Sequence, residues 1–223
     1  MNSRVVFFFD IDGLLLDSEK IYCRFWQKSA SACGFSLSNE QALLLRSLDS
    51  VLAEELFQKW FGHKQVYHVV RSKRKEMMKN YLSLNKYELK PGVIEMLSYL
   101  NNRNISTYVV TSNSFEKAKS VLTEYGLVGF FTGIISTEFV KRGKPFPDVY
   151  LYAASLINEN TGNCFVFEDS PNGIRSAFDA GCKTIMIPDL SPCDNEISCF
   201  VHASYKSLIF ALEDIQNGRG IFK

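Results

Sequence analysis

The chain has 223 residues, enough for one large domain or two small ones, and its net charge of +1 excludes a strongly basic or acidic protein. An apolar content of 46% with 22% charged residues is ordinary for a soluble globular protein. No apolar run reaches the about 18 residues that a membrane span needs. We therefore expect neither a nucleic acid nor a membrane as a partner.

The six cysteines form no CxxC pair and show no zinc-binding spacing. The N-terminal apolar run is short and leads directly into an acidic loop, which differs from the layout of a signal peptide. Scattered cysteines in such a chain are typical of reduced thiols. We therefore expect a cytoplasmic protein, and we expect it to be a monomer.

The first element in chain order is the apolar run VVFFF at 5–9, which predicts a strand buried on both faces. Asp10 and Asp12 follow it. Two carboxylates that close repel each other, and each costs free energy to desolvate. A bound cation would offset that cost, or the two groups could be kept in different protonation states. Alone, the segment could also be a turn in which Asp and Gly13 serve the backbone geometry.

Residues 17–87 contain no convincing strand and have the pattern of several helices, for example AEELFQKWFG at 53–62 and SKRKEMMKNYLSL at 72–84. This stretch is far longer than a single crossover between strands. We therefore predict an inserted α-helical cap domain over 17–87 and a core domain built from 1–16 and 88–223.

Four further apolar runs predict strands at 106–110, 133–136, 164–167 and 184–187, separated by helical patterns near 92–102, 114–125, 147–157 and 171–180. Pro91 suits the first turn of the first of these helices. Ser170 and Pro171 fit the start of the last one, and Gly181 fits its end. Alternating strands and helices predict an α/β fold with a doubly wound parallel sheet.

Polar residues stand after the carboxyl ends of the predicted strands. Ser112 and Asn113 follow the second strand, Lys144 follows the third, and Glu168 and Asp169 follow the fourth. In open α/β sheets these ends form the edge at which ligands bind. Clustered carboxylates favour a hard cation such as Mg²⁺, and a lysine with a hydroxyl group can bind the phosphate that often accompanies it.

Each of these assignments has a structural alternative. Ser112 could only cap the helix that follows it, and Lys144 could be a solvated surface lysine. Glu168 and Asp169 could only favour the dipole of the next helix. The basic run at 71–79 is expected to be a solvated helix face, with contact to a substrate phosphate as the alternative.

Four segments resemble the four motifs of the haloacid dehalogenase superfamily in order, spacing and strand context: DIDGLLLDSE (10–19), VVTSN (109–113), GKPFPDVYL (143–151) and EDSPNGIRSAFDAG (168–181). The resemblance covers nearly the whole chain, because the predicted insertion stands where this family has its helical cap. The nearest subgroup is that of β-phosphoglucomutase and the sugar-phosphate phosphatases. The resemblance implies a Rossmann-like core and phosphoryl-transfer chemistry.

The resemblance also implies a role for each polar residue at the strand ends. Asp10 would be the nucleophile that forms an aspartyl-phosphate, and Asp12 would act as general acid and then as general base. Ser112 and Asn113 would bind the phosphoryl oxygens. Lys144 would neutralise charge on the phosphate and the nucleophile, which anion–anion repulsion makes necessary.

The metal implied by the resemblance is Mg²⁺. Asp10, Asp169 and the backbone carbonyl of Asp12 would hold it, with Glu168 in the coordination sphere or directly behind it. No His or Cys neighbours these acids, which favours Mg²⁺ over Zn²⁺.

Two departures from β-phosphoglucomutase favour a phosphatase. Tyr22 stands where the mutase has a histidine in its first cap helix, and the cap segment LLRSLDSVL carries Arg46 but no glycine. We predict a magnesium-dependent phosphatase of a small phosphorylated metabolite, such as a sugar phosphate. The alternatives are a phosphosugar mutase and a catalytically silent binding protein on the same fold.

The cap is predicted to choose the substrate, since the core motifs contact only what all phosphomonoesters share. Arg46 and Asp49 are candidates for this role, with exposed loop charges as the alternative. Two linkers, near 15–19 and 86–91, would allow the cap to close over the site.

Overall fold

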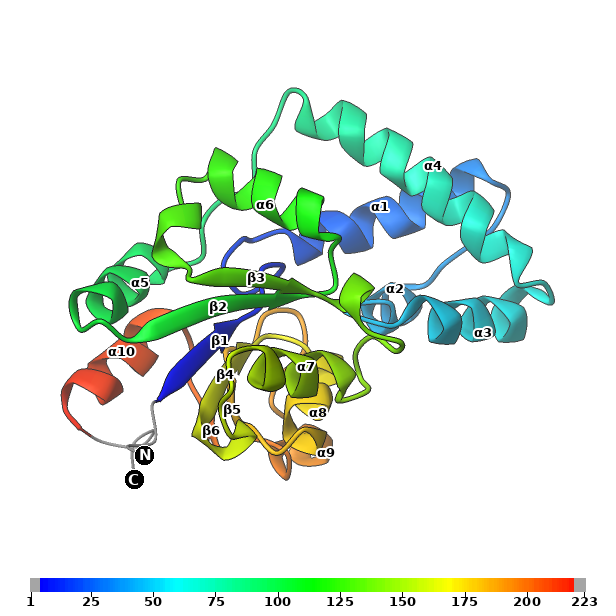
Figure 1. Cartoon of the computed structure of the whole chain (residues 1–223). Coiled ribbons are helices and arrows are strands. Elements are labelled where there is room, and N and C mark those ends of the chain that lie inside the picture. The colour runs from blue at the N-terminus through cyan, green and yellow to red at the C-terminus, as the bar shows by residue number, and fades with distance from the viewer. Residues whose placement is uncertain (1–4, 219–223) are drawn as a thin grey trace.

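The structure is a computed structural model that describes residues 5–218, and six parallel strands form its sheet in the order β3-β2-β1-β4-β5-β6 (Figure 1). The strands are β1 (Val6–Phe9), β2 (Ser106–Thr111), β3 (Gly133–Ser136), β4 (Cys164–Glu168), β5 (Lys183–Met186) and β6 (Ala203–Ser204). Because β1 lies between β2 and β4, the direction of winding reverses at β1, which is where α/β sheets open a ligand site.

Helices cover both faces of the sheet, so the predicted doubly wound core is confirmed. Phe7 and Phe9 pack into one buried cluster with helices α5, α6 and α10, whereas Val6 and Phe8 pack into the other with α7 and α8. This alternation follows from the two-residue repeat of a strand. The helices are α5 (Val93–Asn102), α6 (Phe115–Glu124), α7 (Asp148–Leu156), α8 (Pro171–Asp179), α9 (Asn195–Ser198) and α10 (Leu208–Gln216), with short 3₁₀ helices at Val128–Phe130, Thr137–Phe139 and Thr161–Asn163.

Between β1 and α5 the chain forms four helices and no strand, as predicted: α1 (Glu19–Ala32), α2 (Asn39–Leu44), α3 (Ser50–Phe61) and α4 (Gln65–Leu82). They enclose an apolar cluster of their own, in which the rings of Trp26, Phe57 and Tyr67 pack against one another. The chain enters and leaves this region side by side, because Leu16 and Leu89 form an antiparallel bridge. That the region is a separate domain stays a prediction.

Five of the observed strands were predicted, whereas β6 and α10 were not. Ser170 accepts a hydrogen bond from the Gly173 N–H and Pro171 begins α8, as expected. Pro91 is not in a helix, however. Helix α5 begins at Val93 after Gly92, whose φ of +88° and close approach to Ile209 exclude a side chain.

Within residues 5–218, none of the helices combines the length and apolar character that a membrane span requires.

Candidate active site

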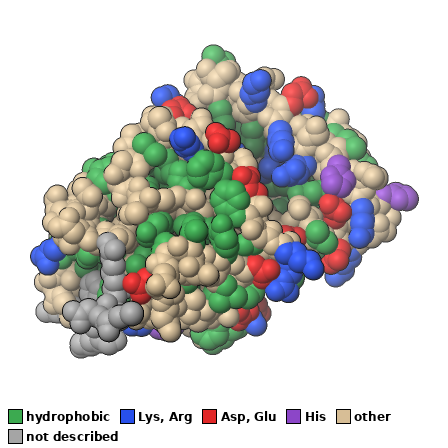
Figure 2. Space-filling view, in the orientation of Figure 1, with side chains coloured by type: hydrophobic (Ala, Val, Ile, Leu, Met, Phe, Trp, Pro, Cys, Tyr) green, Lys and Arg blue, Asp and Glu red, His purple; other side chains and the backbone are tan. Residues whose placement is uncertain are grey.

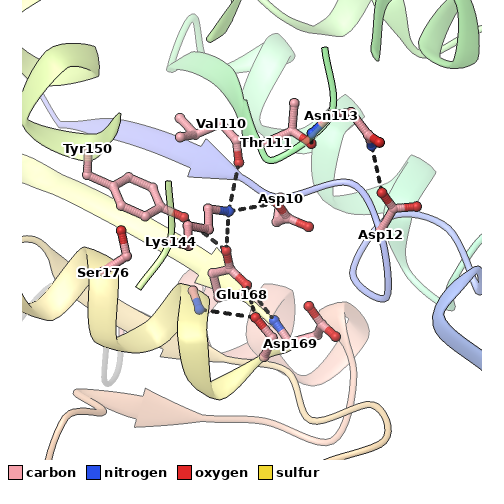
Figure 3. Close-up of polar contacts among 12 residues, drawn as sticks. Asp10, Asp12, Val110, Thr111, Asn113, Lys144, Tyr150, Glu168, Asp169 and Ser176 are labelled. Carbon is pink, nitrogen blue, oxygen red and sulfur yellow. Dashed lines mark hydrogen bonds and ion pairs between the residues drawn. The ribbon is translucent and has the colours of Figure 1, made fainter. Parts of the chain in front are cut away.

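The predicted polar residues meet at the carboxyl ends of β1, β2 and β4. Asp10 directly follows β1, and its N–H donates to the carbonyl of Phe167 in β4 at 3.2 Å. Figure 3 shows Asp10, Lys144 and Glu168 turned toward one another, while Asp12 faces Asn113. The parallel sheet brings these side chains together, because the carboxyl ends of parallel strands lie at the same edge of the sheet.

Lys144 is fully buried and is held by three oxygens. Its Nζ lies 2.8 Å from Asp10 Oδ1, 2.5 Å from Glu168 Oε1 and 3.2 Å from the carbonyl of Val110. Burial opposes its charge, but the charges of Asp10 and Glu168 outweigh that effect and raise the pKa of Lys144 well above its ordinary value. The alternative of a solvated surface lysine is therefore wrong.

Both oxygens of the buried Glu168 carboxylate accept hydrogen bonds. Oε1 accepts from Lys144 and from the Tyr150 hydroxyl at 3.0 Å. Oε2 accepts from the Asp169 N–H and the Ser170 hydroxyl, both at 3.2 Å. With four donors already on it, this carboxylate is better suited to orienting Lys144 than to ligating a metal directly.

Asp10 and Asp169 fit a hard cation. One carboxylate oxygen from each of Asp10, Glu168 and Asp169 lies within 4.8 Å of the other two. Oδ1 of Asp169 is buried and has no hydrogen-bond partner within residues 5–218. Burial raises the pKa of Asp10 to about 7, against the charge of Lys144, and raises that of Asp169 well above its usual range. A divalent cation would offset the cost of burying these negative charges close together, so the residues fit Mg²⁺.

Gly13 leaves the space that Asp169 occupies. Its φ is +80°, and a Cβ there would lie 2.2 Å from Asp169 Oδ2. We expect Gly13→Ala to displace that carboxylate and to weaken Mg²⁺ activation by about 10- to 100-fold, measured as the Mg²⁺ concentration for half-maximal activity. Gly34→Ala is the matched control, since Gly34 has a φ of +82° but open space around it. Equal effects of both substitutions would indicate backbone strain rather than the contact with Asp169.

Asp12 is held on the other side of Asp10 from Lys144. The Ser18 hydroxyl donates to its Oδ1 and the Asn113 side-chain amide donates to its Oδ2, both at 2.6 Å. Lys117 in turn donates to Asn113 Oδ1 at 2.6 Å. The carboxyl group is thus oriented at the cavity wall, as a proton-transfer group must be.

Ser112 lines the same cavity and is exposed in it. The alternative that it caps the next helix is wrong, because the residue before α6 is Ser114. The predicted contacts of Ser112 and Asn113 with a phosphate stay predictions.

Arg46 is buried, so it is not an exposed loop charge. Its Nη1 lies 3.3 Å from Asp169 Oδ2, and its Nη2 donates to the Ser191 hydroxyl. Its backbone carbonyl accepts from the Asn172 side chain at 2.8 Å. The guanidinium group thus reaches from the helical region to the acids of the core, and it also lines the cavity.

Asp49 ties the same helical region to the loop that carries Lys144. Its N–H donates to the carbonyl of Lys144 at 2.7 Å, and its Oδ2 accepts from the N–H of Gly143 at 2.7 Å. The same side chain caps α3 through the N–H of Val51. Asp49 therefore couples the position of α3 to the position of Lys144.

Glu19 was not among the predicted site residues. This residue is buried at the start of α1 and lines the cavity, and burial together with the charge of Asp12 raises its pKa to about 8. A signal was available, since Glu19 closes the motif DIDGLLLDSE, but an acid in the first turn of a helix also has an ordinary dipole role.

A cavity of about 460 Å³ opens beside these groups. Asp10, Asp12 and Ser112 line it on the side of the strand ends, and residues of α1 and α4 line it on the opposite side. Figure 2 shows Lys and Arg side chains gathered on the face where α4 and α1 lie. A carboxylate at the end of β1, a buried lysine and acids suited to Mg²⁺ are groups that phosphoryl transfer requires.

Comparison with known proteins agrees with this geometry. Residues 7–187 match the family described as haloacid dehalogenase-like hydrolase. The chain is 32% identical to hexitol phosphatase A of Escherichia coli (strain K12) over 88% of the chain and 90% of that protein. It is 24% identical to β-phosphoglucomutase of Bacillus subtilis (strain 168) over 82% and 83%. A crystal structure of a hydrolase from Pseudomonas syringae has the same fold, with a TM-score of 0.84, 19% identity, and coverage of 97% and 100%.

Proposed function

Because the chain belongs to the haloacid dehalogenase-like hydrolase family, we propose that it is a magnesium-dependent phosphatase of a small phosphorylated metabolite, such as a sugar phosphate. The observation that carries this proposal is the Asp10 carboxylate at the end of β1, which is paired with the buried Lys144 at 2.8 Å. Asp169 lies nearby, and its Oδ1 has no hydrogen-bond partner within residues 5–218. The first of these groups is a nucleophile, and the others cancel the charge that would oppose its attack.

In the proposed reaction, a carboxylate oxygen of Asp10 attacks phosphorus and the ester P–O bond breaks. The leaving alkoxide takes a proton from Asp12, which Ser18 and Asn113 hold in place. Water then attacks the aspartyl-phosphate and gives its proton to Asp12, which releases inorganic phosphate and regenerates Asp10. Lys144 neutralises negative charge throughout.

Asp10, Asp169 and the backbone carbonyl of Asp12 would hold the Mg²⁺. When bound, the ion would draw electron density from the phosphoryl oxygens. Glu168 would stand behind it, because four protein donors already occupy its oxygens.

Removal of the metal should abolish activity. Hard oxygen ligands release Mg²⁺ to a chelator, so we expect hydrolysis of p-nitrophenyl phosphate to stop in excess EDTA and to recover when Mg²⁺ is added beyond the chelator. Zn²⁺ should not restore it to the same rate. Full activity after exhaustive chelation would contradict the metal assignment and would leave the acids near Asp10 without their proposed role.

The products distinguish a phosphatase from a mutase. The resemblance to β-phosphoglucomutase implies that Tyr22 of α1 replaces a histidine of the mutase. The Tyr22 hydroxyl accepts a hydrogen bond from Lys117 at 2.6 Å. We expect incubation with Mg²⁺ and β-glucose 1-phosphate, followed by phosphorus NMR, to show inorganic phosphate. Efficient conversion to glucose 6-phosphate with negligible phosphate release would instead establish the mutase, and turnover of no phosphomonoester would favour a silent binding protein.

The division into a core and an α1–α4 cap that selects the substrate belongs to the same proposal. Two observations support it. The four helices have an apolar cluster of their own, and the two segments that enter and leave them are joined by the Leu16–Leu89 bridge. The cytoplasmic location and the monomeric state stay predictions.

A further inference from the structure

Helix α4 presents one stripe of its surface to the cavity. The stripe contains three neighbouring cations, Arg71, Arg74 and Lys75. Spacings of three and four residues bring these side chains to one face of the helix. Met78, Lys79 and Leu82 continue the stripe along the same wall. The run at 71–79 was predicted to be a solvated helix face, with contact to a substrate phosphate as the alternative. Five of its residues line the cavity, whereas Lys73 and Glu76 do not.

Arg74 is held in place by aromatic rings. Its guanidinium carbon lies 4.2 Å from the ring centre of Trp26 and 5.1 Å from that of Tyr22. Such contacts orient a guanidinium group without consuming its N–H donors. Its Nε is buried and has no hydrogen-bond partner among residues 5–218, and burial lowers the pKa of Arg74. The group is thus fixed in position and retains capacity to donate.

Arg71, Arg74 and Lys75 form no ion pair within residues 5–218. Within the described part of the chain, no carboxylate oxygen lies within 4.0 Å of Arg71, Arg74 or Lys75. Lys73 of the same helix, by contrast, lies 3.0 Å from Glu76. The charge of Arg71, with burial, lowers the pKa of Lys75. The cations therefore repel one another in a partly enclosed space, and a bound anion would relieve that repulsion.

This cationic face is separate from the reacting groups. A line of contacts runs from Asp12 to Asn113, from Asn113 to Lys117 and from Lys117 to Tyr22, each at 2.6 Å. Arg74 lies against Tyr22 at the end of that line. When the phosphate of a substrate lies at Asp10, the α4 face would therefore be free to contact another part of that substrate. A cavity of about 460 Å³ has room for a phosphorylated sugar.

We propose that Arg71, Arg74 and Lys75 bind a second anionic group of the substrate. This proposal rests on the function proposed above. It narrows the substrates to sugar-sized phosphomonoesters that carry a second anionic group, either a phosphate or a carboxylate, remote from the phosphate that is cleaved. Guanidinium and ammonium groups make charge-assisted hydrogen bonds to either anion.

The test measures binding in an Asp10→Asn background, so that it does not depend on turnover. Isothermal titration calorimetry in the presence of Mg²⁺ compares the dissociation constants of fructose 1,6-bisphosphate and 6-phosphogluconate. Fructose 6-phosphate, which carries only one anionic group, is the control ligand. We expect the bisphosphate to bind at least about 10-fold more tightly than fructose 6-phosphate. Tight binding of 6-phosphogluconate as well would show that a carboxylate suffices, and weak binding would show that a phosphate is required.

The variant Arg71→Gln/Lys75→Gln should lower the preference for the bisphosphate by about 10-fold or more. These two side chains are not part of the buried core, so the variant avoids the packing role of Arg74. Lys73→Gln on the same helix is the matched control and should leave the preference unchanged. No preference in the parent, or a preference that the double variant does not alter, would overturn the proposal. If the wild-type protein hydrolysed no phosphomonoester while the binding preference held, that result would contradict the proposed function and leave the anion site standing.

Discussion

Replacing Asp10 with Asn should lower the turnover number by about 10³-fold or more. The substitution keeps the shape of the side chain but removes the charge that makes its oxygen a nucleophile. Because Lys144 lies 2.8 Å from this carboxylate, the change also deprives a buried ammonium group of one of its two carboxylate partners. The rate is measured at saturating substrate and Mg²⁺, with p-nitrophenyl phosphate as substrate.

Asp17→Asn serves as the control for Asp10→Asn. Asp17 lies in the same motif but forms an ion pair with Lys20 and does not line the cavity. Its variant should keep the wild-type rate within about twofold, as expected for a surface ion pair. Thermal unfolding of both variants shows whether the fold is intact. A folded Asp10→Asn enzyme with a rate within tenfold of wild type would refute the assignment of the nucleophile.

Replacing Lys144 with Met should damage both stability and activity. The change leaves the buried carboxylates of Asp10 and Glu168 without the ammonium group between them. Removal of one partner from a buried ion pair costs about 3–5 kcal/mol of unfolding free energy, since the remaining charge is uncompensated. Urea unfolding measures that loss, and the rate of phosphomonoester hydrolysis should fall with it because charge on the phosphate is no longer neutralised.

A second substitution separates the two effects of Lys144→Met. Adding Glu168→Gln removes one of the uncompensated charges, so part of the stability should return while the activity should not. Lys141→Met, on the same loop but exposed, is the control and should change neither quantity. A Lys144→Met enzyme with a near-normal rate would show that this lysine supports the fold only.

The acids at the strand ends were predictable from the sequence, and one further element was predictable but was not predicted. Asp10 and Asp169 each follow an apolar run, and a parallel sheet brings such ends together whatever the loops do. Strand β6 has only two residues and therefore carries no readable repeat. Helix α10 does carry an apolar stripe, with Leu208, Ala211, Leu212 and Ile215 buried. Its absence from the predictions is thus an omission rather than a lack of signal.

The sequence by itself determined five of the six described strands and the acids that follow β1 and β4, because these depend on local periodicity and on residues next to strand ends. Only the tertiary structure decided what faces the helical region. Arg46 and Asp169 are 123 positions apart, and no local pattern joins them. Likewise, the spacing of Arg71, Arg74 and Lys75 identifies a polar helix face, but a face is a cavity wall or a solvated surface according to what packs opposite it. That depends on the docking of α4 and α1 over the strand ends, which is set by contacts distant in the chain.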